Sequence, residues 1–492
     1  MLRYIISVIL SSLPILCTAA SADTLIMSLD EAIMLARSNS LDASVAVNEL
    51  RTAYWQWRSF KANRLPELSF SGTIPSYTKN YSSYQLDDGS YTFVRNNYIG
   101  LNGKLSVNQI IPFTGGTLSL ETSADYLRTL SGEGDGRFMS VPVALTLNQP
   151  VFGVNTFRWE NKIEPIRYRE AQAAFLQASE EVAMTAISAY FQLLMADSDL
   201  NIARQNHDNS RRLYEVAEAK RRMGQISKND LLQMELNLLE AESALTEAES
   251  ALNEKMFALR SFLDLDGNVR IIPALPAMVS APEVDYADVL DKALERNKFS
   301  RNIRRRQLEA DYEVAQAKGQ LRQITLFAQI GFTGTDSRFD GAYNRLRDNQ
   351  VVELGVKIPL VDWGKRRGQV KVAQSNRDVV EARLRRESLD FKQDIFILTE
   401  RFNNQKKQVE LAAAADGIAL RRYDANIQTY ILGKISTLDL NDSQVKKDEA
   451  RSEYIRQLYL YWFYYYQLRS LTLWDFEHST GIEADFSSLI SR

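Results

Sequence analysis

Leucines recur at every seventh position in the segment that follows Gly224. They are Leu231, Leu238, Leu245, Leu252 and Leu259. The preceding segment carries small or apolar residues in the same rhythm, at Val182, Ala189, Ala196 and Ala203. A seven-residue repeat of apolar positions is typical of helices that pack along one another as coiled coils. The pattern therefore predicts two long helices over residues 154–263, joined by a short turn at Gly224.

Four shorter segments alternate apolar and polar residues instead. In one of them Val141, Val143, Leu145 and Leu147 alternate with polar or small residues, and the others cover residues 68–71, 324–331 and 351–358. Segments of period two and about ten residues are typical of outer-membrane β-barrel strands, with apolar side chains facing lipid and polar ones facing water. A soluble β-sandwich shows the same alternation. Each strand by itself leaves both interpretations open.

Helical and alternating segments occur twice in the same order. The tetrapeptide that begins at Gly224 matches the one at Gly433, since both read Gly-x-Ile-Ser. A proline precedes each glycine by the same 74 residues, at Pro150 and Pro359. Two motifs that keep the same spacing indicate an internal duplication.

The duplication divides the chain into two predicted repeats after a signal peptide at residues 1–22. The first, residues 23–285, contains a helix over 28–64, a β region over 66–150, the helical hairpin over 154–263 and a linker over 264–285. The second, residues 286–492, contains a helix over 286–321, a β-hairpin over 322–359, a helical hairpin over 365–470 and a C-terminal tail. This combination predicts an α+β protein.

The first 22 residues have the pattern of a secretory signal peptide. Arg3 precedes an apolar stretch, and Ala20-Ser21-Ala22 fits the small-residue cleavage rule. Cys17 is the sole cysteine of the sequence, and lipid modification there would require a small residue in place of Leu16. Its acylation stays open. Cleavage after Ala22 leaves a mature chain without disulfides or thiolate ligands.

Composition and motifs exclude several classes of function. The net charge of −3 provides no basic excess for nucleic acid. The two histidines, His207 and His478, lie far apart in the sequence. No metal-ligand cluster, phosphate-binding loop or nucleophile–base pair is found. We therefore predict no enzymatic activity, no cofactor and no metal site.

The predicted strands are too few to close a barrel within one chain, because the smallest known spanning barrels have eight. Three chains that supply four strands each would give twelve and leave no unpaired edge in lipid. The first repeat carries a surplus at residues 98–127, with two further alternating runs. The sequence leaves open whether this surplus forms an extracellular hairpin, a plug in the lumen or additional barrel strands.

The duplicated motifs resemble those of the TolC outer membrane efflux protein family, from Leu29 to about Leu473. The most specific are the two Gly-x-Ile-Ser turns and Asn148-Gln149-Pro150-Val151-Phe152. The resemblance implies a homotrimer in the bacterial outer membrane, with a transmembrane β-barrel of 12 strands and a long periplasmic tunnel of antiparallel coiled-coil helices. It implies passive export in a tripartite efflux or type I secretion system. The implied partners are a periplasmic adaptor (membrane fusion) protein, an inner-membrane pump of the RND, ABC or MFS type, and outer-membrane lipid.

The resemblance also assigns roles around the two glycine turns. The adaptor contacts would be Gly224, Ile226, Ser227, Gly433, Ile435 and Ser436. The periplasmic gate would include Asp230, Tyr430, Asp439 and Asp442, with a closing hydrogen bond between the first two and cation-binding rings formed by the last two. Ile435 departs from the family pattern, in which an arginine completes the gate, and Lys434 or Arg222 would have to replace it. For the two later aspartates, the alternative is a solvated helix start favoured by the helix dipole.

A soluble periplasmic coiled-coil adaptor or scaffold is the competing interpretation of the whole chain. The seven-residue repeat by itself favours this soluble adaptor or scaffold. The four alternating segments and the two complete helical hairpins in tandem favour the channel. The exported cargo, the adaptor and the pump do not follow from the sequence.

Overall fold

The computed structural model describes residues 24–130, 135–278, 283–322, 324–356, 361–432 and 434–491. The predicted signal peptide with Cys17, residues 279–282 of the predicted linker and residues 357–359 of the predicted second β-hairpin lie outside these ranges.

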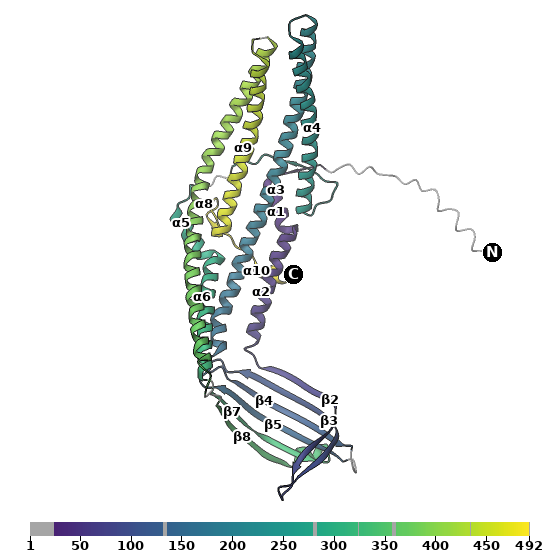
Figure 1. Ribbon diagram of the computed structural model, residues 1–492, viewed down its shortest axis with the longest axis vertical. Helices are drawn as coiled ribbons and strands as arrows, with labels where there is room; N and C mark the ends of the chain where they lie inside the picture. The colour runs from purple at the N-terminus through teal and green to yellow at the C-terminus, as the bar shows by residue number, and fades with distance from the viewer. Residues whose placement is uncertain are drawn as a thin grey trace, which may run out of the picture. The chain divides into compact units, whose positions relative to one another are not determined.

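Helices of matching length recur in the two halves of the chain (Figure 1). In the first half they are α1 (Leu29–Asn39), α2 (Leu41–Ala62), α3 (Thr156–Arg222) and α4 (Lys228–Phe262). In the second half they are α5 (Tyr286–Arg296), α6 (Lys298–Gly319), α8 (Lys365–Ile431) and α9 (Thr437–Thr472). The lengths are 11, 22, 67 and 35 residues, then 11, 22, 67 and 36. Shorter helices are η1 (Gln320–Arg322), α7 (Phe339–Asn344) and α10 (Phe486–Ser491). The boundaries of the two repeats stay a prediction.

The first helix predicted in each half is in fact a pair of helices. Ser40 interrupts the first one with an extended backbone, and its hydroxyl accepts a hydrogen bond from the Ala43 amide at 3.2 Å. Asn297 interrupts the second in the same way, and its side-chain oxygen accepts from the Phe299 amide at 2.8 Å. Both residues are good N-caps, so each ends one helix and starts the next.

One antiparallel sheet of six strands is the main β element (Figure 1). Its strands, in spatial order, are β2 (Glu67–Gln85), β3 (Tyr91–Ile110), β4 (Thr117–Thr129), β5 (Gly136–Pro150), β7 (Ile324–Asp336) and β8 (Leu346–Val356). The sheet therefore has two strands more than the four per chain that we predicted for the barrel, since the surplus at residues 98–127 pairs within the same sheet. Backbone hydrogen bonding explains this pairing, because the N–H and C=O groups of an extended segment find their partners in a neighbouring strand.

Two small sheets complete the β structure. Strand β1 (Thr24–Met27) pairs in parallel with β6 (Arg270–Pro273), and β9 (Trp474–Asp475) pairs with β10 (Thr480–Gly481). The buried hydroxyl of Tyr190 in α3 reaches the carbonyl oxygens of Met27 and Ala274, at 2.9 and 2.6 Å. This side chain therefore fixes β1 and the end of β6 to α3.

The chain divides into two compact units that do not coincide with the predicted repeats. One unit comprises the residues up to Asn48, Phe175–Arg296 and Gln393–Ala484, and the other comprises Glu49–Ala174, Asn297–Lys392 and Asp485–Arg492. Helices α3 and α8 contribute residues to both units.

Aromatic side chains dominate the core of the first unit. Tyr190, Phe191, Tyr461 and Tyr465 are each at most 1% exposed. The Phe402 ring stacks on Tyr461, with centroids 5.6 Å apart. The cluster of aromatic residues near the end of the last long helix is thus part of a packed core. Of the leucines at seven-residue spacing in α4, Leu252 and Leu259 are buried and the other three half-buried.

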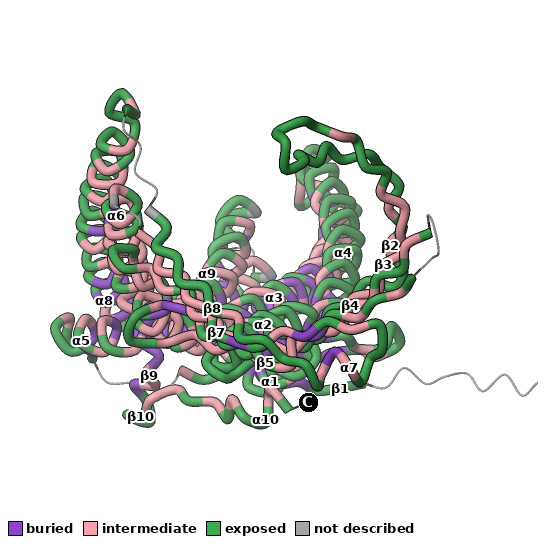
Figure 2. The backbone as a smooth tube through the Cα atoms, turned by 90° about the horizontal axis from the view of Figure 1, so that it is seen from below, coloured by how far each residue is buried: buried purple, intermediate pink, exposed green. Residues whose placement is uncertain are grey.

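Burial is concentrated in the helices, whereas most strand residues are exposed or half-buried (Figure 2). None of the helices in the described ranges combines the length and the apolar character that a membrane-crossing helix requires.

Candidate functional site: the helical hairpin tips

The first tip joins α3 to α4 through Gly224. This glycine has a φ of +75°, a left-handed conformation in which side chains with a Cβ are strained. The Gly224 amide donates to the carbonyl of Arg221 at 2.9 Å, and the Gln225 amide donates to that of Lys220 at 2.9 Å. These bonds close the last turn of α3 as helix-ending glycines commonly do. The glycine is required by the turn geometry itself.

A capping box begins α4 directly after this turn. The Ser227 amide donates to the Asp230 carboxylate at 3.0 Å, and the Asp230 amide donates to the Ser227 hydroxyl at 3.1 Å. Reciprocal bonds of this kind satisfy two backbone amides that a helix start leaves free. Between the exposed Gly224 and Ser227, Ile226 is half-buried.

The second tip repeats this arrangement at the start of α9. The Ser436 amide donates to the Asp439 carboxylate at 3.2 Å, and the Asp439 amide donates to the Ser436 hydroxyl at 3.2 Å. Ile435 is half-buried, as Ile226 is at the first tip. Gly433 lies outside the described residues. The two tips thus present the same chemistry at two places in the chain.

The capping carboxylates are held in their charged form. Hydrogen bonds from Ser227 lower the pKa of Asp230, and hydrogen bonds from Ser436 lower the pKa of Asp439. Both groups are exposed and therefore ionised at neutral pH. Each of these aspartates has a structural role at its helix start, whatever further role it has in a gate.

Two cations near the tips were missed by sequence reasoning. The guanidinium of Arg422 in α8 pairs with the Asp442 carboxylate of α9 at 2.6 Å. The Lys220 ammonium of α3 lies 5.5 Å from the centre of the Tyr430 ring of α8. The Asp230 carboxylate bonds Ser227, and no bond between it and Tyr430 is found within the described residues. No local spacing in the sequence links either cation to its partner, because each contact joins different helices.

Neither proposed replacement for the missing gate arginine, Arg222 or Lys434, forms an ion pair with a predicted gate carboxylate among the described residues. Arg222 lies 3.6 Å from Glu218 of its own helix, and Lys434 is exposed. Arg422 is the cation that the structure places beside a predicted gate carboxylate.

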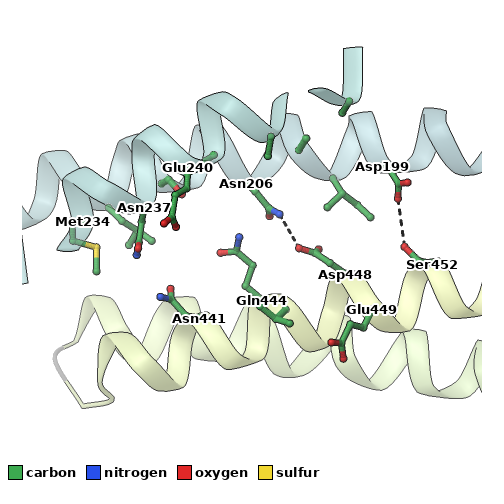
Figure 3. A pocket seen from close by; sticks show the side chains of 18 residues that line it. Asp199, Asn206, Met234, Asn237, Glu240, Asn441, Gln444, Asp448, Glu449 and Ser452 are labelled. Carbon is green, nitrogen blue, oxygen red and sulfur yellow. Dashed lines mark hydrogen bonds between the residues drawn. The ribbon is translucent and has the colours of Figure 1, made fainter. Parts of the chain in front are cut away.

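A groove of about 660 Å³ runs between α3, α4 and α9 beyond the tips (Figure 3). Alanines form part of its lining, at Ala203, Ala241, Ala244 and Ala248. Two hydrogen bonds cross between α3 and α9. They join Asn206 to Asp448 at 2.8 Å and Ser452 to Asp199 at 3.4 Å. Polar contacts therefore connect the two helical hairpins along this groove.

Asp475, Glu477 and His478 form a possible cation site in the described part of the chain, with ligand atoms within 4.8 Å of one another. The Asp475 carboxylate is already engaged by the Tyr465 hydroxyl at 2.6 Å and the Arg469 guanidinium at 2.7 Å. Burial alone would raise the pKa of Asp475, but these two groups outweigh it and lower the pKa to about 2. The neighbouring guanidinium disfavours a metal cation, so this cluster is best explained as an internal ion network.

Sequence comparison identifies the family. The model of the outer membrane efflux protein family matches residues 32–264 and 290–472, which is most of the chain. A comparison with curated proteins finds no match.

Solved structures share the fold at low sequence identity. The outer membrane channel CmeC of Campylobacter jejuni is 15% identical, with 94% of this chain and 88% of that chain covered and a TM-score of 0.65. CusC is 15% identical, with 90% and 91% covered and a TM-score of 0.62. The outer membrane protein VceC from Vibrio cholerae is 17% identical, with 92% and 97% covered and a TM-score of 0.57. Together with the long helices and the antiparallel sheet, this likeness confirms the predicted α+β fold class.

The family match decides between the interpretations that the sequence left open. This family comprises channels of efflux systems and is not a family of enzymes, so the soluble adaptor is no longer a competing interpretation. The chain belongs to the outer membrane efflux protein family and is an outer-membrane channel of an efflux system, with a long periplasmic helical portion.

Proposed function

We propose that three copies of this chain form a passive exit channel whose hairpin tips dock a periplasmic adaptor. Efflux channels of this kind generally operate as trimers with adaptor and pump partners. The observation that carries the proposal is the six-stranded sheet, whose outer strands β2 and β8 each have one neighbour strand among the described residues. A spanning sheet must leave no unpaired edge in lipid, and six strands are fewer than the eight of the smallest spanning barrels.

Exposed apolar side chains on the long helices support the same assembly. Leu232, Leu236 and Leu239 on α4 are 51%, 49% and 58% exposed. Leu411 and Ile418 on α8 are 53% and 59% exposed. Long helices that leave such residues uncovered are suited to packing against further helices. In the proposed trimer, helices of the neighbouring copies cover them.

The tips are suited to a partner that recognises two similar turns per copy. At each tip a half-buried isoleucine directly precedes the serine that caps the next helix. A trimer presents six such turns, two from each copy, so several adaptor subunits could each bind a similar turn. Gly224, Ile226 and Ser227 would contact one adaptor subunit, and Gly433, Ile435 and Ser436 the next.

The gate proposal combines Asp439 and Asp442 near the start of α9. Repeated around a threefold axis, the two carboxylates form stacked rings that bind cations at the periplasmic end. The Arg422 guanidinium partly neutralises Asp442, while the Lys220–Tyr430 contact connects the two hairpins of one copy. Opening of the channel separates the hairpins, with Asp230 and Tyr430 among the residues that change partners.

Planar-bilayer recording of the purified channel tests the rings. Asp439→Asn/Asp442→Asn is expected to abolish block by divalent or trivalent cations added on the tip side. Asparagine retains a hydrogen-bond acceptor for the capping box, so the start of α9 is preserved. Asp424→Asn, which removes one exposed carboxylate from the same hairpin, should leave the block unchanged. Unchanged block in the double variant would reject the ring assignment.

The adaptor that binds the tips can be identified by crosslinking, and its identity then indicates the pump and the cargo. A photo-crosslinking residue placed at Ile226 or Ile435 should capture a periplasmic adaptor in intact cells, and mass spectrometry of the product identifies the system. The same residue placed at Leu275, outside both tips, serves as the control. Capture from Leu275 but from neither tip would contradict docking at the tips.

A further inference from the structure

We propose that the hairpin of β2 and β3 extends past the rest of the sheet onto the outer leaflet of the membrane. There Lys79 and Arg95 bind the phosphorylated sugars of the leaflet's glycolipid, which in a bacterial outer membrane is lipopolysaccharide. This contact rests on the outer-membrane location of the channel. It is separate from the exit pathway and from the adaptor contacts at the helical tips.

Strands β2 and β3 are longer than the other strands of the sheet. They have 19 and 20 residues, whereas the others have 15 or fewer. Strand β4 pairs with β3 from Tyr98 onward, so residues 79–85 and 91–97 pair with each other and with no third strand of the described ranges. We call these two segments, with the turn 86–90, the outer ribbon. At about 3.4 Å per residue, it extends about 24 Å along its own axis.

The outer ribbon lies at the end of the sheet away from the helices (Figure 1). Helix α2 ends at Ala62 and β2 begins at Glu67, so the start of β2 marks the helical end. The helices are the periplasmic portion of the channel, and the turn 86–90 therefore faces the exterior. A strand crosses the membrane in about nine to eleven residues. Strands of 19 and 20 residues extend well past that layer.

One face of the hairpin is apolar near the helical end. Leu68 lies opposite Val107, and Phe70 lies opposite Leu105. Directly opposite residues of antiparallel strands point to the same face. Leu68 and Phe70 are 65% and 72% exposed, and apolar side chains exposed on a strand of an outer-membrane channel face lipid. This is the outward face of the hairpin.

A β-bulge decides which residues of the outer ribbon share this face. The register shifts between Thr73 and Ser76, where two residues of β2 face one of β3. One extra residue exchanges the two faces of a strand, so odd-numbered residues of β2 take the outward positions beyond the bulge. Tyr77, Lys79 and Tyr81 therefore continue the outward face. Without the bulge, the polar residues between them would point there instead.

The outward face of the outer ribbon is aromatic and cationic. Tyr81 and Phe93 are 69% and 75% exposed. Arg95 lies directly opposite Tyr81. Lys79 and Arg95 are the only charged residues among positions 77–85 and 91–99, and both are exposed. No carboxylate on these two strands neutralises them, so this face is complementary to an anionic surface.

The order of side chains along this face matches the layers of a glycolipid leaflet. Apolar Phe70 comes first, then Tyr77, then the two cations. Aromatic residues favour the boundary between acyl chains and headgroups. Arginine and lysine bind phosphate with charge-assisted hydrogen bonds. Lys79 and Arg95 are diagonal neighbours across the two strands, about 7–8 Å apart, so both can reach the phosphates of one headgroup.

The other face of the outer ribbon is bonded within itself. The Asn96 side-chain amide donates to the Asn80 side-chain oxygen at 3.0 Å and to the Ser82 hydroxyl at 2.8 Å. A two-stranded ribbon is marginally stable alone in water. Because its polar face already has these bonds, a surface that stabilises the ribbon is best placed on the aromatic and cationic face. The headgroup layer provides that surface.

Native mass spectrometry of the purified channel in mild detergent tests this contact, with diphosphoryl lipid A as the probe. The unmodified channel should retain the lipid, and Lys79→Gln/Arg95→Gln should weaken its binding about 25-fold, because each cation near an anionic lipid surface contributes about fivefold. The charge-preserving variant Lys79→Arg/Arg95→Lys should bind like the unmodified channel. It also shows whether substitution at these positions disturbs the fold. Lipid A without its phosphates should bind the unmodified channel as weakly as the phosphorylated lipid binds the double glutamine variant.

Arg137 provides the matched control. It is exposed and lies in one row with Leu127 and Gly100, which places it on the face opposite to Lys79. Arg95→Gln should weaken binding about fivefold, whereas Arg137→Gln should leave it unchanged. Equal binding by the unmodified channel and Lys79→Gln/Arg95→Gln would overturn the inference. So would equal losses in Arg95→Gln and Arg137→Gln, because the lipid would then respond to net charge and not to the outward face.

Discussion

Glu180 is the acidic centre of an ion cluster in the aromatic core of the first unit. Its side chain is 1% exposed and lies 2.5 Å from the Arg37 guanidinium and 3.0 Å from that of Arg469. Arg469 also pairs with Asp475 at 2.7 Å. The four formal charges sum to zero. The substitution Glu180→Gln preserves the shape of the side chain but leaves one net positive charge in the cluster.

The cost of this change follows from burial. Removal of one member of a buried ion pair typically costs about 3–5 kcal/mol, because the remaining charge is left without compensation. Arg469 is 13% exposed and has no easy access to water, whereas Arg37 is 33% exposed and can turn toward solvent. Burial alone would lower the pKa of Arg469, but the charge of Glu180 outweighs it and raises the pKa. We therefore expect a loss of about 3 kcal/mol, at the lower end of that range.

Guanidinium unfolding in detergent, followed by circular dichroism, measures the effect. With an m value of about 5 kcal/mol/M, the midpoint should fall by about 0.6 M. The control is Glu181→Gln, which removes the same charge from the next residue. Glu181 is exposed, so its replacement should change the stability by no more than about 0.5 kcal/mol.

A double-mutant cycle identifies the interaction. Glu180→Gln combined with Arg469→Gln should cost less than the sum of the single changes, with a coupling of about 1–3 kcal/mol. Equal midpoints for Glu180→Gln and Glu181→Gln, or strictly additive losses in the cycle, would refute the reasoning.

Two other predictions concern Tyr190 and Gly224. Burial raises the pKa of Tyr190 to about 12, so the neutral phenol stabilises the fold fully below pH 10, the ordinary pKa, and this contribution is lost as pH rises toward 12. Tyr190→Phe should lower the free energy of unfolding by about 1–2 kcal/mol at neutral pH. It should also remove the part of the stability loss between pH 10 and 12 that ionisation of Tyr190 causes. An unchanged loss of stability over this pH range would contradict this role of Tyr190. Gly224→Ala should destabilise the first tip by about 1 kcal/mol because φ is positive there, measured as faster hydrogen exchange of the amides of residues 225–231. Gly267→Ala, equally open but without a positive φ, is its control, and equal exchange in both variants would show that the turn does not require glycine.

The sequence by itself determined the helical hairpins, because their signals are local. Leucines at seven-residue spacing and a glycine turn predict helix, turn and helix without reference to the rest of the chain. In the structure, capping boxes at Ser227 and Ser436 begin α4 and α9. The alternation in β5 and β7 likewise fixed which side chains share a face.

The tertiary structure alone decided where the strands pair and which charges meet. The surplus at residues 98–127 alternates in the sequence, but alternation does not specify a neighbour, since hydrogen bonds between strands join residues far apart in the chain. The pairs Arg422–Asp442 and Glu180–Arg469 span 20 and 289 residues, and no local spacing encodes such contacts. The strand count and the ion cluster therefore followed from packing, whereas the tips followed from local sequence.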